Sequence, residues 1–223
     1  MRILGPLLAV AYPAVCEALV FHAGYVVFSI LVSWLGTVAL AAHRVCISVE
    51  SLAFMPCTGL AVAAATHTGQ RLGAGRPDLA AEGIARVRRR AIAYMVVVGL
   101  ILFVFAGPIV RVYTDDPEVA VVAVPALHVG ATELVPLGIS MAMTGALQGA
   151  GDTTSPLWIT LVGIWLVRLP STLLVVFMGW GLVAVWVVTA LDWVVRSYLA
   201  DRAIRSGRWR GVLNSGGSAC QEP

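Results

Sequence analysis

The chain has 223 residues, of which 59% are hydrophobic and 12% are charged, and its formal net charge is +3 at pH 7. Soluble domains contain roughly 45–50% apolar residues, so this composition indicates a membrane protein whose side chains mostly contact lipid. All 15 basic residues are arginines, which excludes a Walker A lysine and a Schiff base to retinal or pyridoxal phosphate. We therefore expect neither an enzyme nor a bound cofactor, and any transport would draw on an ion gradient or a partner.

Six apolar stretches follow one another along the chain, each long enough to cross the hydrocarbon layer. They cover approximately residues 6–33, 37–67, 88–107, 118–147, 156–178 and 181–200. Glycine, proline and aspartate lie between them, as is typical of turns. The sequence thus predicts an all-α polytopic membrane protein, with about six transmembrane helices in residues 1–210. The Gly- and Ser-rich segment 211–223 is predicted to be a disordered cytoplasmic tail.

Arginines are concentrated on one side of this predicted topology. Six lie between residues 71 and 90, and four more lie between residues 202 and 210. The opposite side has Arg44, Arg111 and an acidic group at 115–118. Because cytoplasmic loops carry an excess of basic residues, we expect both termini in the cytoplasm and a multi-pass protein of the plasma membrane.

Ionisable residues also fall near the midpoints of the predicted helices, where charges are costly and usually functional. They are four acids and one arginine: Glu17, Glu50, Glu133, Asp192 and Arg168. Full ionisation would leave uncompensated negative charge in a low dielectric, so either some acids are protonated or a cation binds. These residues predict a cation-binding or proton-relay cavity. Ion pairs and hydrogen bonds that only hold the helices together are the alternative explanation.

Glu133 is the first candidate for the ion or substrate site. It lies between Pro125 and Pro136, where a bend in the helix would expose it to an aqueous cavity. The further candidates are Glu17, Glu50 and Asp192. Arg168 is predicted to be a structural counter-ion, and His128, five residues before Glu133, is a candidate proton relay. The histidines and cysteines show no metal-site spacing, and we expect the histidines to be hydrogen-bonded interior or interface residues.

Several short segments, taken in order, resemble the multidrug and toxin extrusion (MATE) family. Residues 35–43 (LGTVALAAH), 50–56 (ESLAFMP) and 69–75 (GQRLGAG) look like its seventh and eighth helices. Residues 145–153 (GALQGAGDT) resemble its signature after the tenth helix, and 168–170 (RLP) and 190–193 (ALDW) resemble its last two helices. The resemblance covers about residues 6–210 and implies the carboxy-terminal six-helix lobe of a twelve-helix transporter.

This resemblance implies an antiporter lobe that exports cationic drugs or toxins by alternating access, in exchange for H⁺ or Na⁺. It also implies that the lobe is incomplete alone, with an amino-terminal half or a second copy as partner beside small cations and lipid, and no nucleic acid. Phe21 and Leu137 stand where sodium-coupled members have acids, with Glu17 and Glu133 one turn earlier. A lipid-linked oligosaccharide flippase of the same superfamily and a non-transporting truncated fragment are the alternatives.

Overall fold

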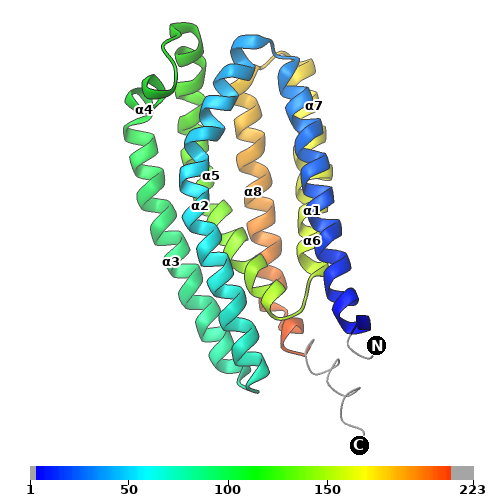
Figure 1. The fold of residues 1–223 in the computed structure, drawn as a ribbon. Helices are drawn as coiled ribbons and strands as arrows, with labels where there is room; N and C mark the ends of the chain where they lie inside the picture. Colours follow the sequence, from blue (N-terminus) through cyan, green and yellow to red (C-terminus); the bar gives the residue numbers. More distant parts are fainter. Residues whose placement is uncertain (1–3, 212–223) are drawn as a thin grey trace, which may run out of the picture.

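The computed structural model describes residues 4–211, which form a bundle of long helices running roughly side by side (Figure 1). In chain order the helices are α1 (Leu4–Ser33), α2 (Thr37–Gly73), α3 (Pro77–Val104), α4 (Ala106–Tyr113), α5 (Pro117–Gly149), α6 (Thr154–Leu161), the π-helix η1 (Val162–Arg168), α7 (Leu169–Phe177), α8 (Gly181–Arg205) and the short 3₁₀-helix η2 (Arg208–Arg210). No strand occurs within the described residues. The predicted all-α class is therefore confirmed.

Five spans in the described chain are long and apolar enough to cross a membrane, and there are six if one bent pair of helices counts as a single span. The five are Ala11–Ser33, Thr37–Gly73, Pro117–Gly149, Thr154–Phe177 and Gly181–Arg205, and the pair is α3 with α4, which meet at 77°. The predicted polytopic architecture is thus confirmed. The membrane boundaries and the division into a lobe at 1–210 and a tail at 211–223 stay predictions, and residues 212–223 lie outside the described part.

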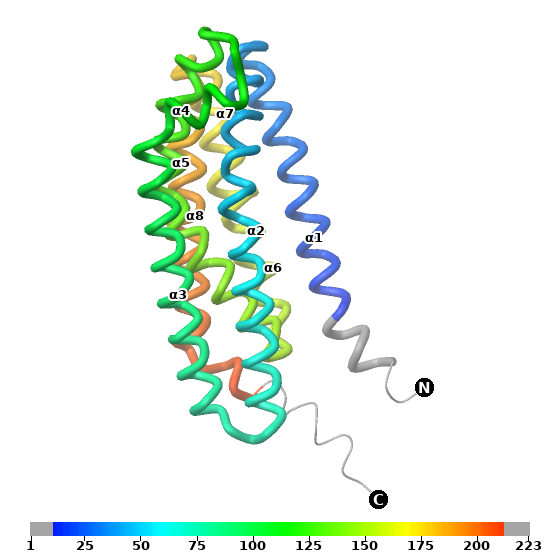
Figure 2. Tube along the Cα trace, turned by 60° about the vertical axis from the view of Figure 1, so that its left-hand side comes forward, coloured from blue at the N-terminus to red at the C-terminus, as the bar shows by residue number. Residues whose placement is uncertain are grey.

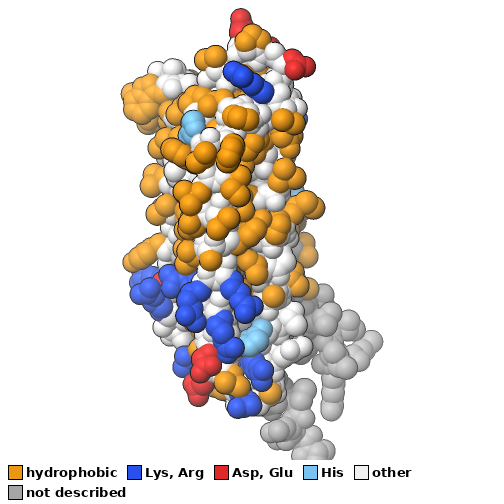
Figure 3. All heavy atoms as spheres, turned by 90° about the vertical axis from the view of Figure 1, so that its left-hand side faces the viewer, with side chains coloured by type: hydrophobic (Ala, Val, Ile, Leu, Met, Phe, Trp, Pro, Cys, Tyr) orange, Lys and Arg blue, Asp and Glu red, His pale blue; other side chains and the backbone are white. Residues whose placement is uncertain are grey.

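On the face shown in Figure 3, apolar side chains cover the bundle between its two ends, and most of the arginines gather at one end. Val97, Leu100 and Phe177 are 57%, 60% and 77% exposed, respectively. Soluble monomers rarely expose continuous apolar surface of this extent. We therefore infer that these exposed apolar side chains contact lipid.

Helix α5 lies at the centre of the bundle and packs against α2, α3 and α8. Glycines allow its backbone to approach α2 closely: a Cβ added to Gly145 would lie 2.5 Å from the carbonyl oxygen of Ala61. A Cβ on Gly149 would overlap the Ala65 carbonyl in the same way. Small residues at such contacts are typical of packed membrane helices. This packing holds the middle of α5, where Glu133 lies, in the interior of the bundle.

The span from Thr154 to Phe177 is interrupted by the π-helix η1, which ends at Arg168. The span begins where Asp152 Oδ1 accepts a hydrogen bond from the Ser155 amide at 3.0 Å. Pro170 follows η1 and lacks the amide that would continue regular α-helical hydrogen bonding one turn back. Short π segments are often found at functional sites. Here the segment carries Arg168 into contact with α8.

Candidate functional site

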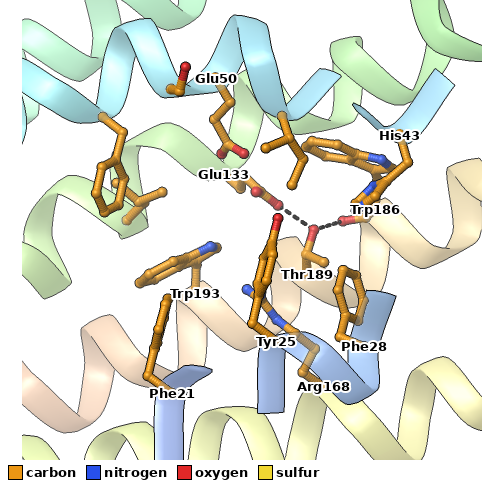
Figure 4. Close-up of a pocket in the computed structure, with 14 residues that line it drawn as sticks. Phe21, Tyr25, Phe28, His43, Glu50, Glu133, Arg168, Trp186, Thr189 and Trp193 are labelled. Carbon is orange, nitrogen blue, oxygen red and sulfur yellow. Dashed lines mark hydrogen bonds between the residues drawn. The ribbon is translucent and has the colours of Figure 1, made fainter. Parts of the chain in front are cut away.

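A cavity of about 260 Å³ lies inside the bundle, lined by α1, α2, α5, η1 and α8 (Figure 4). Six of its fourteen lining residues are aromatic: Phe21, Tyr25, Phe28, Phe54, Trp186 and Trp193. Its charged groups are Glu50, Glu133 and Arg168. The cavity thus combines π faces, which attract cations, with two acids and one base.

Glu50 and Glu133 are the acidic pair of this cavity, and their carboxyl groups face each other from α2 and α5 (Figure 4). Glu133 is 2% exposed, and Oε1 of Glu50 is buried without a hydrogen-bond partner among the described residues. Neither acid forms an ion pair with any arginine in the described part of the chain. Two facing carboxylates in a low dielectric repel each other, so the pair favours a shared proton or a bound cation.

The hydroxyl of Thr189 connects Glu133 to the backbone of α8. Its Oγ1 lies 2.7 Å from Glu133 Oε2 and 2.8 Å from the carbonyl oxygen of Trp186. An ionised Glu133 accepts the single hydroxyl proton. A protonated Glu133 can instead donate to Oγ1, and the hydroxyl then donates to the Trp186 carbonyl. The same geometry therefore satisfies both protonation states of Glu133 without any movement of the helices.

A buried ion triad lies next to the acidic pair and ties η1 to α8. Asp192, which is 0% exposed, receives a hydrogen bond at Oδ1 from Arg196 Nε at 2.8 Å. Its Oδ2 forms an ion pair with Arg168 Nε, also at 2.8 Å. The Arg168 guanidinium lies 5.4 Å from the ring centre of Phe28 and 5.6 Å from that of Trp193. Because Asp192 already neutralises one of the two arginines, the triad has one net positive charge.

The structure separates the sequence-predicted residues into three places. Glu50, Glu133 and Arg168 line the cavity, and Asp192 joins them through Arg168. Glu17 instead accepts hydrogen bonds from Gln148 at 3.0 Å and Thr160 at 3.2 Å, where it connects α1 with α5 and α6. His128 packs against Phe103, with 4.8 Å between ring centres, and does not line the cavity. The functional roles of these residues stay predictions.

Several cavity residues were not among the predicted site residues. His43 packs edge-on between Phe28 and Trp186, at 5.5 and 5.7 Å between ring centres. Both its ring nitrogens are buried and, within the described residues, have no hydrogen-bond partner, so the prediction of a hydrogen-bonded interior histidine was wrong. The rings of Phe28 and Trp186 lie against His43, where hydrogen-bonding partners of the imidazole were expected. The spacing of the aromatic residues could have indicated this wall. Phe21, Tyr25 and Phe28 are four and three residues apart, and Trp186 and Trp193 are seven apart, so each set lies on one face of its helix.

No group of three or more histidine, cysteine, aspartate or glutamate side chains in the described chain is arranged to hold a metal ion. Phe21 and Leu137, the two apolar replacements noted in the sequence, both line the cavity. They bring their side chains to the same space as Glu50 and Glu133. The acids of this cavity are therefore at positions 50 and 133, and not at positions 21 and 137, where the resemblance placed the acids of sodium-coupled members.

Comparison with known protein sequences identifies one family. The profile of the MatE family matches residues 13–174. A probable multidrug resistance protein NorM of Thermotoga maritima is 35% identical over 211 residues, covering 93% of this chain and 45% of the relative. The multidrug resistance protein MdtK of Edwardsiella ictaluri is 32% identical over 166 residues, covering 74% of this chain and 36% of the relative.

Solved structures share the fold. An outward-facing multidrug resistance MATE family transporter of the MOP superfamily superposes with a TM-score of 0.84 at 19% identity, covering 91% of this chain and 45% of that one. The Vibrio cholerae MATE transporter VcmN in its bent form gives 0.83 at 20% identity, covering 92% and 47%. The chain therefore spans less than half the length of these relatives.

Proposed function

This chain belongs to the multidrug and toxin extrusion (MATE) family, and we propose that it forms one lobe of an ion-coupled exporter of cationic drugs or toxins. The family's members are transporters and not enzymes. The observation that carries the proposal is the facing pair of Glu50 and Glu133 in an aromatic cavity, without an arginine of their own. A cation fits this site better than an anion does, which disfavours the pyrophosphate of a lipid-linked oligosaccharide.

The coupling would follow from competition for the same carboxyl groups. An organic cation placed against the aromatic wall gains from the ring faces and from the negative charge of the pair. A proton or Na⁺ arriving at Glu50 or Glu133 removes that charge, so the organic cation leaves more easily. Thr189 would allow Glu133 to change protonation state in place. Exchange then requires only that the cavity be exposed to the two sides of the membrane in turn.

We propose that the cavity is completed by a partner, either an amino-terminal half or a second copy of this chain. On the side formed by α1 and α2 the lining is partly open, since Ser51 is exposed and Phe21 and Tyr25 are only half-buried. A volume of about 260 Å³ is also below the roughly 300–1,000 Å³ of typical drug-sized sites. Both termini would lie in the cytoplasm of a plasma-membrane protein.

Binding of tetraphenylphosphonium to the purified chain tests this function directly. We expect Glu133→Gln and Glu50→Gln each to weaken binding at least about tenfold, since tenfold is ~1.4 kcal/mol and a contact with a charged group is worth ~1.5–3 kcal/mol. Wild-type binding should strengthen as the pH rises, because protons and the probe compete for the same groups. In the double variant that pH dependence should disappear. Sodium chloride compared with choline chloride at equal ionic strength identifies whether Na⁺ competes as well.

The matched control is Glu82→Gln, which removes an exposed acid from α3 and should leave binding unchanged. In an assembled transporter, Glu133→Gln should also abolish gradient-driven efflux while membrane insertion stays normal. Equal affinity and equal pH dependence in the wild type and the double variant would refute the acidic pair as the site.

A further inference from the structure

We propose that the outer face of α3 binds an anionic phospholipid, with the lipid phosphate held by Arg89 and Arg90 and the acyl chains lying along the apolar side of the same helix. This site is separate from the cavity and does not depend on the proposed transport function. It rests on helix geometry, on the charge balance at one end of the bundle and on the position of α3 at its edge.

The helical spacing places the arginines in line with the lipid-facing surface of α3. Arg90, Val97 and Val104 are seven residues apart, close to two turns each, and Arg89 is three turns from Leu100. All five side chains are exposed. Val97 lies about 10 Å above Arg90 along the helix axis, at 1.5 Å per residue. A phosphate at the arginines would therefore have its acyl chains beside the exposed valines and leucine.

The charge balance leaves these two arginines free, unlike their neighbours. Arg86 Nη2 pairs with Glu82 at 3.3 Å on the same helix. Arg88 Nη2 reaches across to Asp201 of α8 at 3.4 Å, and Asp201 also receives Arg205 Nη2 at 2.6 Å. Neither Arg89 nor Arg90 has an acidic partner among residues 4–211. Guanidinium groups bind phosphate in a bidentate manner, so two exposed ones at consecutive positions of α3, without acidic partners in the described chain, favour a phosphodiester that both long side chains can reach.

The space-filling view (Figure 3) shows basic and apolar side chains in the same order on the face of the molecule that α3 occupies. A belt of arginines lies directly below the apolar band on the side of the molecule that α3 occupies (Figure 3). This is the order in which a phospholipid presents its headgroup and its chains. In both ribbon views α3 and α1 stand at opposite edges of the bundle (Figures 1 and 2). A partner that covered the open side of the cavity at α1 and α2 would therefore leave α3 in contact with lipid.

Native mass spectrometry of the full chain in mild detergent tests the site with defined lipids. We expect dioleoylphosphatidylglycerol to remain bound and dioleoylphosphatidylcholine to be lost, since only the first has a net negative charge. Each arginine near an anionic headgroup contributes about a fivefold gain in affinity, so Arg89→Gln with Arg90→Gln should weaken retention ~30-fold. Arg89→Lys with Arg90→Lys keeps the charge and should retain most of the binding.

The matched control is Arg71→Gln with Arg76→Gln, which removes the same charge from two exposed arginines near the α2–α3 turn, off the α3 stripe, that form no ion pair with any described residue. It should leave phosphatidylglycerol retention within twofold of wild type. Equal retention of the two lipids by the wild-type chain overturns the proposal without any variant. So does an equal loss in the control pair, which would show a diffuse charge effect. Displacement of the lipid by millimolar inorganic phosphate would show a site for free anions, and that too is contrary to the proposal.

Discussion

At the scale of single residues, Arg168 makes two kinds of contact, one with Asp192 and one with the cavity, and substitutions can show which of them matters more. It pairs with the fully buried Asp192 and also faces the cavity beside the ring of Trp193. Arg168→Gln would leave Asp192 with Arg196 as its one remaining partner among the described residues. Asp192 keeps one arginine, so the loss is that of one contact between charged groups, which typically costs about 1.5–3 kcal/mol. We therefore expect a lower yield of folded protein and a lower unfolding temperature, measured by fluorescence-detected gel filtration after heating.

The folded yield and the cation binding of these variants also distinguish a structural role of Arg168 from a role in the cavity. Arg168→Lys keeps the charge and should restore part of the yield. If Arg168→Gln folded normally and lost cation binding, its contact with the cavity would matter more than its pair with Asp192.

A position near the middle of a helix could be predicted for these ionisable residues, but their partners could not. Glu133, Asp192 and Arg168 are buried, and they lie in the middle parts of their spans. Helix rotation decides the rest. His128 is five residues before Glu133, which turns it by roughly 140° around α5 and towards Phe103 on α3. Glu17 finds Gln148 and Thr160 because α1 packs against α6, a tertiary contact that no local pattern contains.

At the scale of the elements, the close packing of the π-helix η1 against α8 leaves no room for a side chain at Gly163. A Cβ at this position would overlap Asp192 Oδ1 and Arg196 Nε. These atoms belong to the buried triad and have little freedom to move. Gly163→Ala should therefore destabilise the protein by about 1–3 kcal/mol, as overpacking does elsewhere. Thermal unfolding followed by tryptophan fluorescence measures this change.

Gly59 of α2 provides the comparison, because a Cβ there meets nothing within 4 Å. Gly59→Ala should be neutral or stabilising by roughly 0.5–1 kcal/mol, since alanine loses less conformational entropy in a helix. A Gly163→Ala variant as stable as Gly59→Ala would mean that η1 can move away from α8 at little cost.

Helix number and order could be predicted from hydropathy, whereas helix limits and breaks could not. Helix α3 begins at Pro77, whereas its apolar stretch starts near residue 88. The part before the apolar stretch is helical but lies among arginines. Hydropathy reports contact with lipid and not backbone hydrogen bonding. The 77° bend between α3 and α4 and the π-helix have no apolar signature either. They depend on packing and on local chemistry such as the missing amide of Pro170.

At the scale of the whole molecule, the positions of the loops allow a direct test of topology. The α2–α3 turn and the end of α8 lie at the same end of the bundle as the start of α1, and the α4–α5 turn lies at the other end (Figure 1). In a cysteine-free background, we expect Arg76→Cys and Arg205→Cys to be labelled from the cytoplasm and Asp115→Cys from outside. This follows from the arginine bias. Labelling of Arg76→Cys and Asp115→Cys from the same side would contradict the span formed by α3 and α4.

The last prediction concerns what one copy of this chain can do by itself. Glu133, Asp192 and Arg168 are already buried within this chain, so we expect these three charges not to prevent it from folding alone. Transport is different, because alternating access needs two bodies that move around a shared cavity, and the α1 and α2 side of this cavity is open.

A monomer reconstituted into vesicles should therefore bind organic cations yet give no gradient-driven efflux of ethidium. Light scattering of the purified chain in mild detergent establishes its mass, and efflux is then measured on the same preparation. A dimer with efflux would identify a second copy as the missing lobe, and efflux restored by an added amino-terminal half would identify that half. A monodisperse monomer that drives efflux alone would refute the need for a partner, since its cavity would then reach both sides of the membrane without a second body.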